Sequence, residues 1–134
     1  MVTRVICVLL VLVGGVGVSL PSRAQPTTTE QPDDPGVIVY RTNYCGVCHE
    51  LPAAGTRGTF GPSHVGMGAI AAERIADPAY GGQATSPAEY LAESILQPTA
   101  YLVPGYATTA HPMPSFAHLP EADITALVNL LLAQ

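Results

Sequence analysis

Five consecutive residues, Cys45-Gly46-Val47-Cys48-His49, bring two thiols and one imidazole close together in the chain. The remaining cysteine, Cys7, lies in an apolar stretch near the N-terminus. Thiols and imidazoles act as redox pairs, as metal ligands or as points of cofactor attachment. What these three side chains hold therefore decides what the protein does.

Three kinds of chemistry compete for this stretch. A disulfide or redox pair needs Cys45 and Cys48 alone, but a thioredoxin-like pair occurs near a βαβ pattern, which is absent from the sequence. A zinc site would need a second Cys or His pair at suitable spacing, and adjacent Cys48 and His49 would ligate one tetrahedral ion poorly. Cys-x-x-Cys-His is the attachment signature of c-type haem, and it uses all three side chains. The motif favours one covalent haem c, with His49 on the iron, over the redox pair and the metal site.

A second axial ligand would have to come from further along the chain. Met113 stands between Pro112 and Pro114, which restrict the backbone and suit a weak thioether ligand that must be placed in advance. A thioether opposite an imidazole raises the reduction potential, as in electron carriers. His111, two residues away, is the alternative ligand. The other candidates are expected to be loop, surface or packing residues: His64, His118 and Met67.

The N-terminus has the features of an export signal. A basic start at Arg4 precedes an apolar run over residues 5–18, and Ser22 and Ala24 occupy the small-residue positions of a cleavage site. We expect a signal peptide over residues 1–24 and a periplasmic or otherwise exported protein; an uncleaved membrane anchor is the alternative. Residues 25–34, QPTTTEQPDD, are expected to form a disordered acidic linker. The domain then spans residues 35–134.

Acidic side chains dominate the part of the chain after the signal. Three arginines and no lysine stand against ten carboxylates, which leaves a formal net charge of −7. Nucleic-acid binding requires clustered basic residues, so that class is excluded. A partner attracted by electrostatics would instead present a basic docking face.

The first half of the domain contains two expected helices. Asp34 and Pro35 form an N-cap and N1 pair for a helix towards Tyr44, although GVIVY is also compatible with a strand. Residues 51–66 are rich in Gly, Pro and Thr and are expected to be loop. A short helix is expected over residues 67–75.

The second half is marked by stronger signals. Ser86, Pro87 and Glu89 form a capping box for a helix that Pro98 ends, with Leu91 and Ile95 on one face. Residues 99–118 carry several prolines and are expected to be coil. A last helix from Pro120 to the end carries an apolar stripe, formed by Ile124, Leu127, Val128 and Leu131. The sequence predicts an all-α fold of few short helices and long loops.

So few helices offer a small chain little apolar surface to bury. Domains of this kind need a disulfide, a metal or a cofactor for stability. A disulfide between Cys45 and Cys48 would close a very short loop and would stabilise little. A haem would supply a larger apolar centre.

Residues 36–133 resemble the class I monohaem cytochromes c of the bacterial branch. CGVCH matches the attachment motif, GPSHVG at 61–66 is similar to the Gly-Pro loop, and MP at 113–114 is similar to the axial-methionine motif. YLAESILQPTAYLVPGY and the C-terminal LVNLLL resemble one subgroup. The resemblance implies a small cytochrome c fold whose short helices and long loops wrap around one covalently attached haem.

Residue by residue, the resemblance implies thioether bonds at Cys45 and Cys48, with His49 and Met113 as axial ligands. It also implies that the Pro62 carbonyl accepts the Nδ1 proton of His49, and that Gly36 and Tyr40 face the last helix. Two positions depart from the subgroup, namely Leu119 in place of a capping serine and Asn129 in place of an aromatic.

These observations predict a single-electron carrier, not an enzyme, that passes electrons between exported or membrane-bound redox proteins. The alternative is a haem c subunit of a larger dehydrogenase or oxidase complex. A ligand-binding or peroxidase-type haem protein is less favoured, because Met113 is well placed to fill the sixth position.

Overall fold

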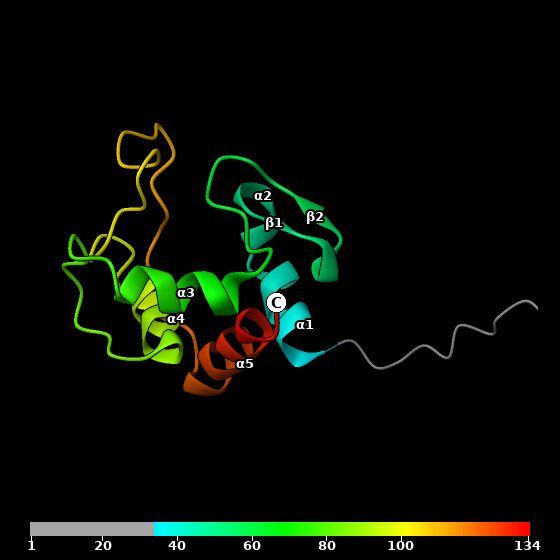
Figure 1. The fold of residues 1–134 in the computed structure, drawn as a ribbon. Helices are drawn as coiled ribbons and strands as arrows, with labels where there is room; N and C mark the ends of the chain where they lie inside the picture. The colour runs from blue at the N-terminus through cyan, green and yellow to red at the C-terminus, as the bar shows by residue number, and fades with distance from the viewer. Residues whose placement is uncertain (1–33) are drawn as a thin grey trace, which may run out of the picture.

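A computed structural model of the chain describes residues 34–134. The expected signal peptide and the linker up to residue 33 lie outside the described residues. The elements, in chain order, are α1 (Pro35–Thr42), α2 (Cys45–Cys48), β1 (Glu50–Leu51), the 3-10 helix η1 (Pro52–Ala54), β2 (Thr56–Arg57), α3 (Met67–Ile75), α4 (Pro87–Leu96) and α5 (Glu121–Leu132). The domain is mostly helical, as expected, but it also contains a small two-stranded sheet (Figure 1).

Helix α1 forms although its sequence is rich in β-branched residues. The Asp34 carboxylate accepts a hydrogen bond of 2.7 Å from the backbone N–H of Gly36, and Pro35 occupies the first turn. The cap satisfies a free N–H group of the first turn. Val37 and Tyr40 are buried, so tertiary packing adds what propensity lacks. The helix ends at Thr42, two residues earlier than expected.

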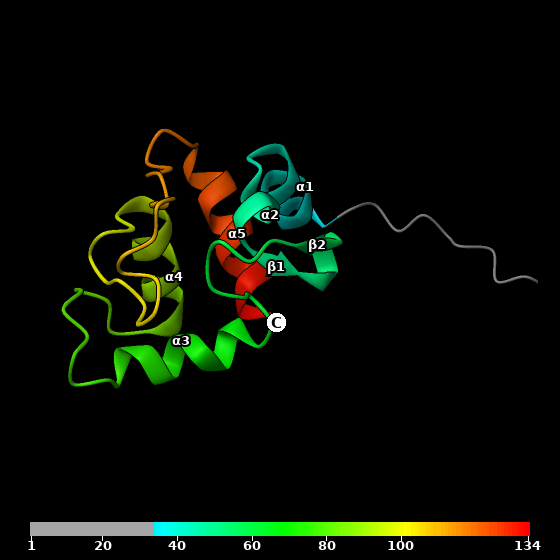
Figure 2. The same ribbon diagram turned by 90° about the horizontal axis from the view of Figure 1, so that it is seen from above.

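Helices α1 and α5 lie side by side (Figures 1 and 2). A Cβ atom at Gly36 would collide with the Ala126 carbonyl oxygen and with the Leu130 side chain. The absence of a side chain at Gly36 therefore allows the two helices to approach closely, as the expected crossing at this residue requires. Asn129 is exposed on α5.

Helix α4 has the predicted capping box. The Ser86 hydroxyl accepts from the Glu89 N–H at 3.3 Å, and the Glu89 carboxylate accepts from the Ser86 N–H at 3.1 Å. Leu91 and Ile95 are buried, as their spacing predicted. The prediction for this helix is confirmed.

Helix α5 begins without a side-chain cap. Pro120 is its N-cap residue and provides no capping hydrogen bond, in agreement with the missing serine at Leu119. Glu121 and Asp123 in the first turn compensate in part, because carboxylates interact favourably with a helix N-terminus. The four residues of the expected stripe are buried, together with Leu130.

Residues 51–66 are not all loop, which corrects the expectation. Strand β1 pairs antiparallel with β2, with Glu50 opposite Arg57 and Leu51 opposite Thr56. The Thr56 hydroxyl donates to the His49 carbonyl oxygen at 3.0 Å and accepts from the Leu51 N–H at 3.1 Å. The sequence did not predict these strands, because strands of two residues are too short to show an alternating hydrophobic pattern. The loop is closed by the hydrogen bonds of the Thr56 side-chain hydroxyl.

Between α4 and α5 the chain has no helix or strand, as expected for residues 99–118. Phe116 N–H donates to the Ile95 carbonyl at 3.1 Å, and the Ser115 hydroxyl donates to the Leu96 carbonyl at 2.6 Å. These two hydrogen bonds connect the far end of the segment to the C-terminal end of α4. No helix within residues 34–134 is long and apolar enough to cross a membrane.

Candidate functional site

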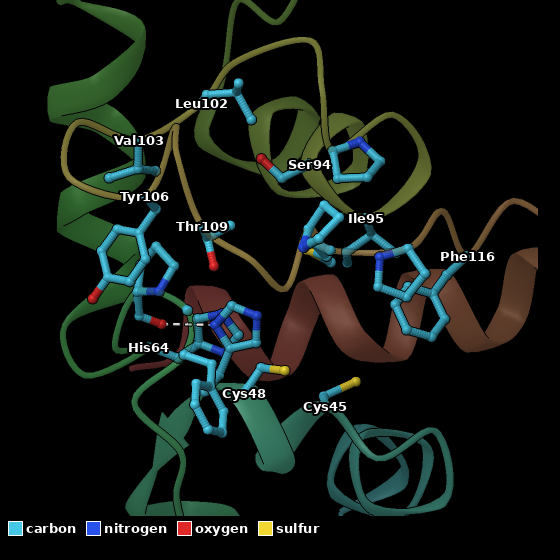
Figure 3. A pocket seen from close by; sticks show the side chains of 18 of the residues that line it. Cys45, Cys48, His64, Ser94, Ile95, Leu102, Val103, Tyr106, Thr109 and Phe116 are labelled. Atoms are coloured by element: carbon cyan, nitrogen blue, oxygen red, sulfur yellow. Dashed lines mark hydrogen bonds between the residues drawn. The ribbon is translucent and has the colours of Figure 1, made fainter.

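The two cysteines are presented by one short helical turn. Cys45 and Cys48 begin and end α2, both are half-buried free thiols, and both line the same cavity. Figure 3 shows them on one side of that cavity, with Leu102, Val103 and Thr109 across from them. Burial raises the pKa of the Cys45 thiol to about 11, so this group stays protonated at neutral pH.

Tight packing explains why glycine follows the first cysteine. A Cβ atom at Gly46 would overlap the Thr56 side chain on β2. Tyr44, just before α2, has a positive φ of 58° and leaves its side chain 77% exposed. The close packing of α2 on β2 thus fixes the positions of the two thiols.

His49 follows α2 directly and is buried, with 8% of its surface exposed. Its backbone adopts an extended conformation, and its Nδ1 lies 2.7 Å from the Pro62 carbonyl oxygen. Because a carbonyl only accepts, Nδ1 carries the hydrogen, and Nε2 is left with a lone pair. Burial lowers the pKa of His49, while the bond to Pro62 opposes that effect. The result is a neutral imidazole in the tautomer that binds metal ions through Nε2.

The Gly-Pro loop leaves room for this imidazole. A Cβ atom at Gly61 would collide with the His49 ring, and one at Gly58 would collide with the backbone of Cys48 and His49. The Gly61 N–H also donates to the Cys48 carbonyl at 2.9 Å. The two glycines therefore let this loop lie directly against the motif.

Facing these residues is a mainly apolar cavity of about 480 Å³. Such a volume lies within the range of small-molecule and cofactor sites. The walls come from α2, α3, α4, the Gly-Pro loop and the segment between α4 and α5. Among residues 34–134, no Asp or Glu lines the cavity, and Arg74 is the one permanently charged lining residue.

Arg74 comes from the last turn of α3. It donates to the Tyr90 hydroxyl at 2.9 Å, lies over the Tyr90 ring at 5.8 Å and is 4.0 Å from the Met67 sulfur. No carboxylate is among these partners. A partly buried guanidinium that has no anionic partner within the described part of the chain, beside an apolar cavity, favours a ligand that carries negative charge.

Both candidates for the sixth ligand line the cavity. Met113 is partly buried, whereas His111 is exposed and packs its ring on Phe60 at a centroid distance of 5.0 Å. His118 is exposed and does not line the cavity. Met67 is 2% exposed and lies in the core, as expected for a packing residue.

His64 departs from the expectation that it is a plain loop or surface histidine. It lies in a loop, but it is partly buried and its ring stacks on that of His49, with a centroid distance of 4.2 Å. Burial lowers the pKa of His64 to about 3, with smaller contributions from His49 and Arg74. The imidazole is therefore neutral at physiological pH. Its place in GPSHVG, two residues after Pro62, was a signal that it lies near His49.

The structure brings together the residues that the sequence singled out. Cys45, Cys48, His49 and Met113 line one cavity, and the Pro62 carbonyl is bonded to His49. Sequence reasoning missed Arg74 and Tyr90, because nothing in the spacing of an arginine and a tyrosine on two different helices shows that they meet. Within residues 34–134, no cluster of three or more His, Cys, Asp or Glu side chains is suited to a metal ion.

Comparison of the chain with protein-family models, with curated proteins and with solved structures returns no match. The resemblance to cytochromes c thus rests on the sequence motifs alone.

Proposed function

We propose that residues 35–134 form a cytochrome c-like domain that carries single electrons by means of one covalently bound c-type haem. The observation that carries the proposal is the convergence on one apolar cavity of two free thiols, a buried neutral imidazole and a methionine thioether. Each is the group that a c-type haem requires for attachment or for iron ligation.

The residues present fit this cofactor. Cys45 and Cys48 would hold it through thioether bonds, and His49 and Met113 would bind its iron. Arg74 and the Tyr90 hydroxyl offer hydrogen-bond donors for its carboxylates, which accounts for a cation that has no carboxylate partner among residues 34–134. When bound, the haem supplies one-electron redox chemistry through its ferrous and ferric states.

The chain's own groups would shape that chemistry. The Pro62 carbonyl holds the proton on Nδ1 of His49 and so keeps Nε2 available as the ligand. Apolar side chains of α4 and of the segment after it, such as Leu91, Ile95 and Phe116, exclude water from the cavity. A filled sixth position and a dry site favour electron transfer over ligand binding.

The decisive experiment is expression of the whole chain, with its N-terminal segment, together with a haem-attachment system. We expect a coloured protein whose intact mass exceeds that of the polypeptide by one haem. The Cys45→Ser/Cys48→Ser double variant should lose both colour and added mass and should fold poorly. A colourless, folded wild-type protein with the mass of the polypeptide alone would refute the proposal.

The same preparation separates the alternative roles. A free carrier should run as a monomer and should bind carbon monoxide poorly when reduced. A subunit of a dehydrogenase or oxidase complex would co-purify with its partner, and a ligand-binding or peroxidase-type protein would bind carbon monoxide readily. The mass of the mature chain would also show whether cleavage follows Ala24, as expected of an exported protein, or whether the leader remains as a membrane anchor.

A further inference from the structure

A second imidazole lies against the proposed iron ligand. The rings of His64 and His49 are nearly parallel, at 13°, with their centroids 4.2 Å apart. Figure 3 shows His64 on the same side of the cavity as the two cysteines. This flat contact restricts one face of the His49 ring, and Gly61 of the Gly-Pro loop also lies close to the ring.

Tyr40 holds His64 from the other side. The Tyr40 hydroxyl lies 3.2 Å from Nδ1 of His64 and 3.4 Å from the His49 carbonyl oxygen, and the two rings meet edge to face at 73°. The Tyr40 hydroxyl has one hydrogen, which it donates either to Nδ1 of His64 or to the His49 carbonyl oxygen. In the second arrangement, Nδ1 of His64 donates its own hydrogen to the Tyr40 hydroxyl oxygen. In either arrangement the buried side chain of Tyr40 ties α1 to the His64 ring.

The backbone of His64 is fixed as well. Its N–H donates to the Glu50 carbonyl on β1 at 2.9 Å, and its carbonyl accepts from the Met67 N–H at 3.3 Å. The ring is therefore anchored by the sheet, by the start of α3 and by α1.

His49 needs such a support to have a defined plane. The second side-chain torsion of histidine has a broad energy minimum, and a hydrogen bond at Nδ1 tolerates a range of angles. The bond to Pro62 thus fixes which nitrogen carries the proton, but it restrains the tilt of the ring only loosely. The His64 ring, stacked on the face of the His49 ring, removes much of this remaining freedom to tilt.

We propose that His64, held in place by Tyr40, is a positioning residue that sets the plane of the His49 imidazole. The proposal rests on the proposed function only for the identity of what His49 binds. It concerns a contact between side chains of the chain itself, so it can be tested whether or not haem is attached.

Four variants separate stacking from hydrogen bonding and from general stability. His64→Leu removes the ring, His64→Phe keeps an aromatic ring without the polar atoms, and Tyr40→Phe removes the hydroxyl alone. His118→Leu is the matched control, because it deletes an exposed histidine that does not line the cavity. Thermal unfolding of each protein shows that it is folded before any spectrum is compared.

In the haem-loaded protein the readout is the ferric electron paramagnetic resonance spectrum and the spread of the paramagnetically shifted haem-methyl NMR signals. Both report the orientation of the axial imidazole plane, which a change in stability alone does not move. We expect a clear shift in His64→Leu, a smaller one in Tyr40→Phe, a return towards wild type in His64→Phe and none in His118→Leu. Folded His64→Leu with wild-type spectra would overturn the proposal, and so would an equal shift in His118→Leu. If His64→Leu does not fold, unchanged spectra of Tyr40→Phe overturn it.

An intact mass without haem would refute the proposed function and would leave the contact to be tested in the haem-free chain. There the readout is the nuclear Overhauser effect between the rings of His49 and His64, together with the ¹⁵N shifts of His49. We expect a strong effect in wild type and altered His49 shifts in Tyr40→Phe. Absence of the ring-to-ring effect in the folded wild-type chain would overturn the positioning role.

Discussion

Met113 and His111 are two residues apart and both line the cavity, yet their surroundings differ. Met113 is partly buried between two prolines, whereas His111 is exposed and packs on Phe60. A partly buried thioether needs no desolvation of a polar ring before it can bind, which is the reason to propose Met113 over His111 as the ligand.

Replacement of the thioether tests that choice. Met113→Ala should abolish the sulfur-to-iron charge-transfer absorption of the oxidised protein and should allow carbon monoxide to bind the reduced form. The reason is that the sixth coordination position is then open. His111→Ala is the control and should leave both properties as in wild type. The reverse pattern, with Met113→Ala silent and His111→Ala altered, would assign the ligand to His111.

Gly61 tests how closely the loop must approach the imidazole. A Cβ atom there would collide with the His49 ring, so we expect Gly61→Ala to destabilise the fold by about 1–3 kcal/mol, as overpacking does. Gly81→Ala is the control, because nothing lies within 4 Å of a Cβ atom at that position. Urea unfolding of both variants gives the comparison. Equal stability of the two proteins would show that the loop yields at little cost.

The neutral state of His64 predicts how stability depends on pH. Its pKa of about 3 in the folded chain is below the usual value of 6.5, so between these values the unfolded chain binds a proton that the folded chain does not. The free energy of unfolding should therefore fall as the pH is lowered from about 6.5 towards 3. His64→Leu should flatten this dependence, and His118→Leu should not. Urea unfolding at pH 7 and pH 5 measures it, and identical slopes in wild type and His64→Leu would contradict the account.

At the scale of the elements, the helices that shape the cavity differ in how they begin. Helix α4 has a complete capping box, whereas α5 begins at Pro120 without a side-chain cap. The start of α5 depends instead on the packing of its buried stripe and on the close contact with α1 at Gly36. Helix α4, which contributes Tyr90, Leu91 and Ile95 to the cavity, is thus the one stabilised locally.

Removal of the α4 cap should lower the stability of the whole domain. Ser86→Ala leaves the Glu89 N–H without its side-chain partner and should lower the free energy of unfolding by about 1 kcal/mol. Thr59→Ala, in an exposed loop position, is the control and should have little effect. Chemical unfolding of both proteins is the measurement. A loss no larger than that of Thr59→Ala would show that packing alone sets the start of α4.

For the whole molecule, the distribution of charge matters for the proposed encounter with partners. The net charge after the expected signal is strongly negative, yet no carboxylate lines the cavity and its mouth exposes Tyr44, Val47 and Phe60. Attraction would therefore come from the net negative charge of the chain, while close contact would be made by apolar side chains.

This arrangement predicts a salt-dependent encounter. Electron transfer between the haem-loaded protein and a redox protein of net positive charge should become slower as ionic strength rises from about 0.01 to 0.15 M, because screening shortens the reach of the attraction. Reduction by an uncharged small molecule is the control and should not depend on salt. Stopped-flow kinetics gives both rates. Salt-independent reduction of the basic partner would remove the proposed role of the acidic surface.

The local features of this protein could be predicted from its amino-acid sequence. The capping box at Ser86, the cap at Asp34, the stripe on α5 and the helix over residues 67–75 all depend on neighbours within a few positions, and local patterns report such interactions directly. For the same reason the CGVCH motif and the clamped Met113 could be singled out as candidate site residues.

Contacts between residues far apart in the chain could not be predicted in this way. Arg74 and Tyr90 come from two helices, Tyr40 and His64 from a helix and a loop, and the hydroxyl of Thr56 closes a turn that contains a small sheet. No spacing rule relates such pairs, because their contact follows from how α1, α3, α4 and α5 pack around one core. The stacking of His64 on His49 belongs to this second kind, since the packing of Tyr40 and β1 around the loop, and not the loop sequence alone, turns that ring towards the site.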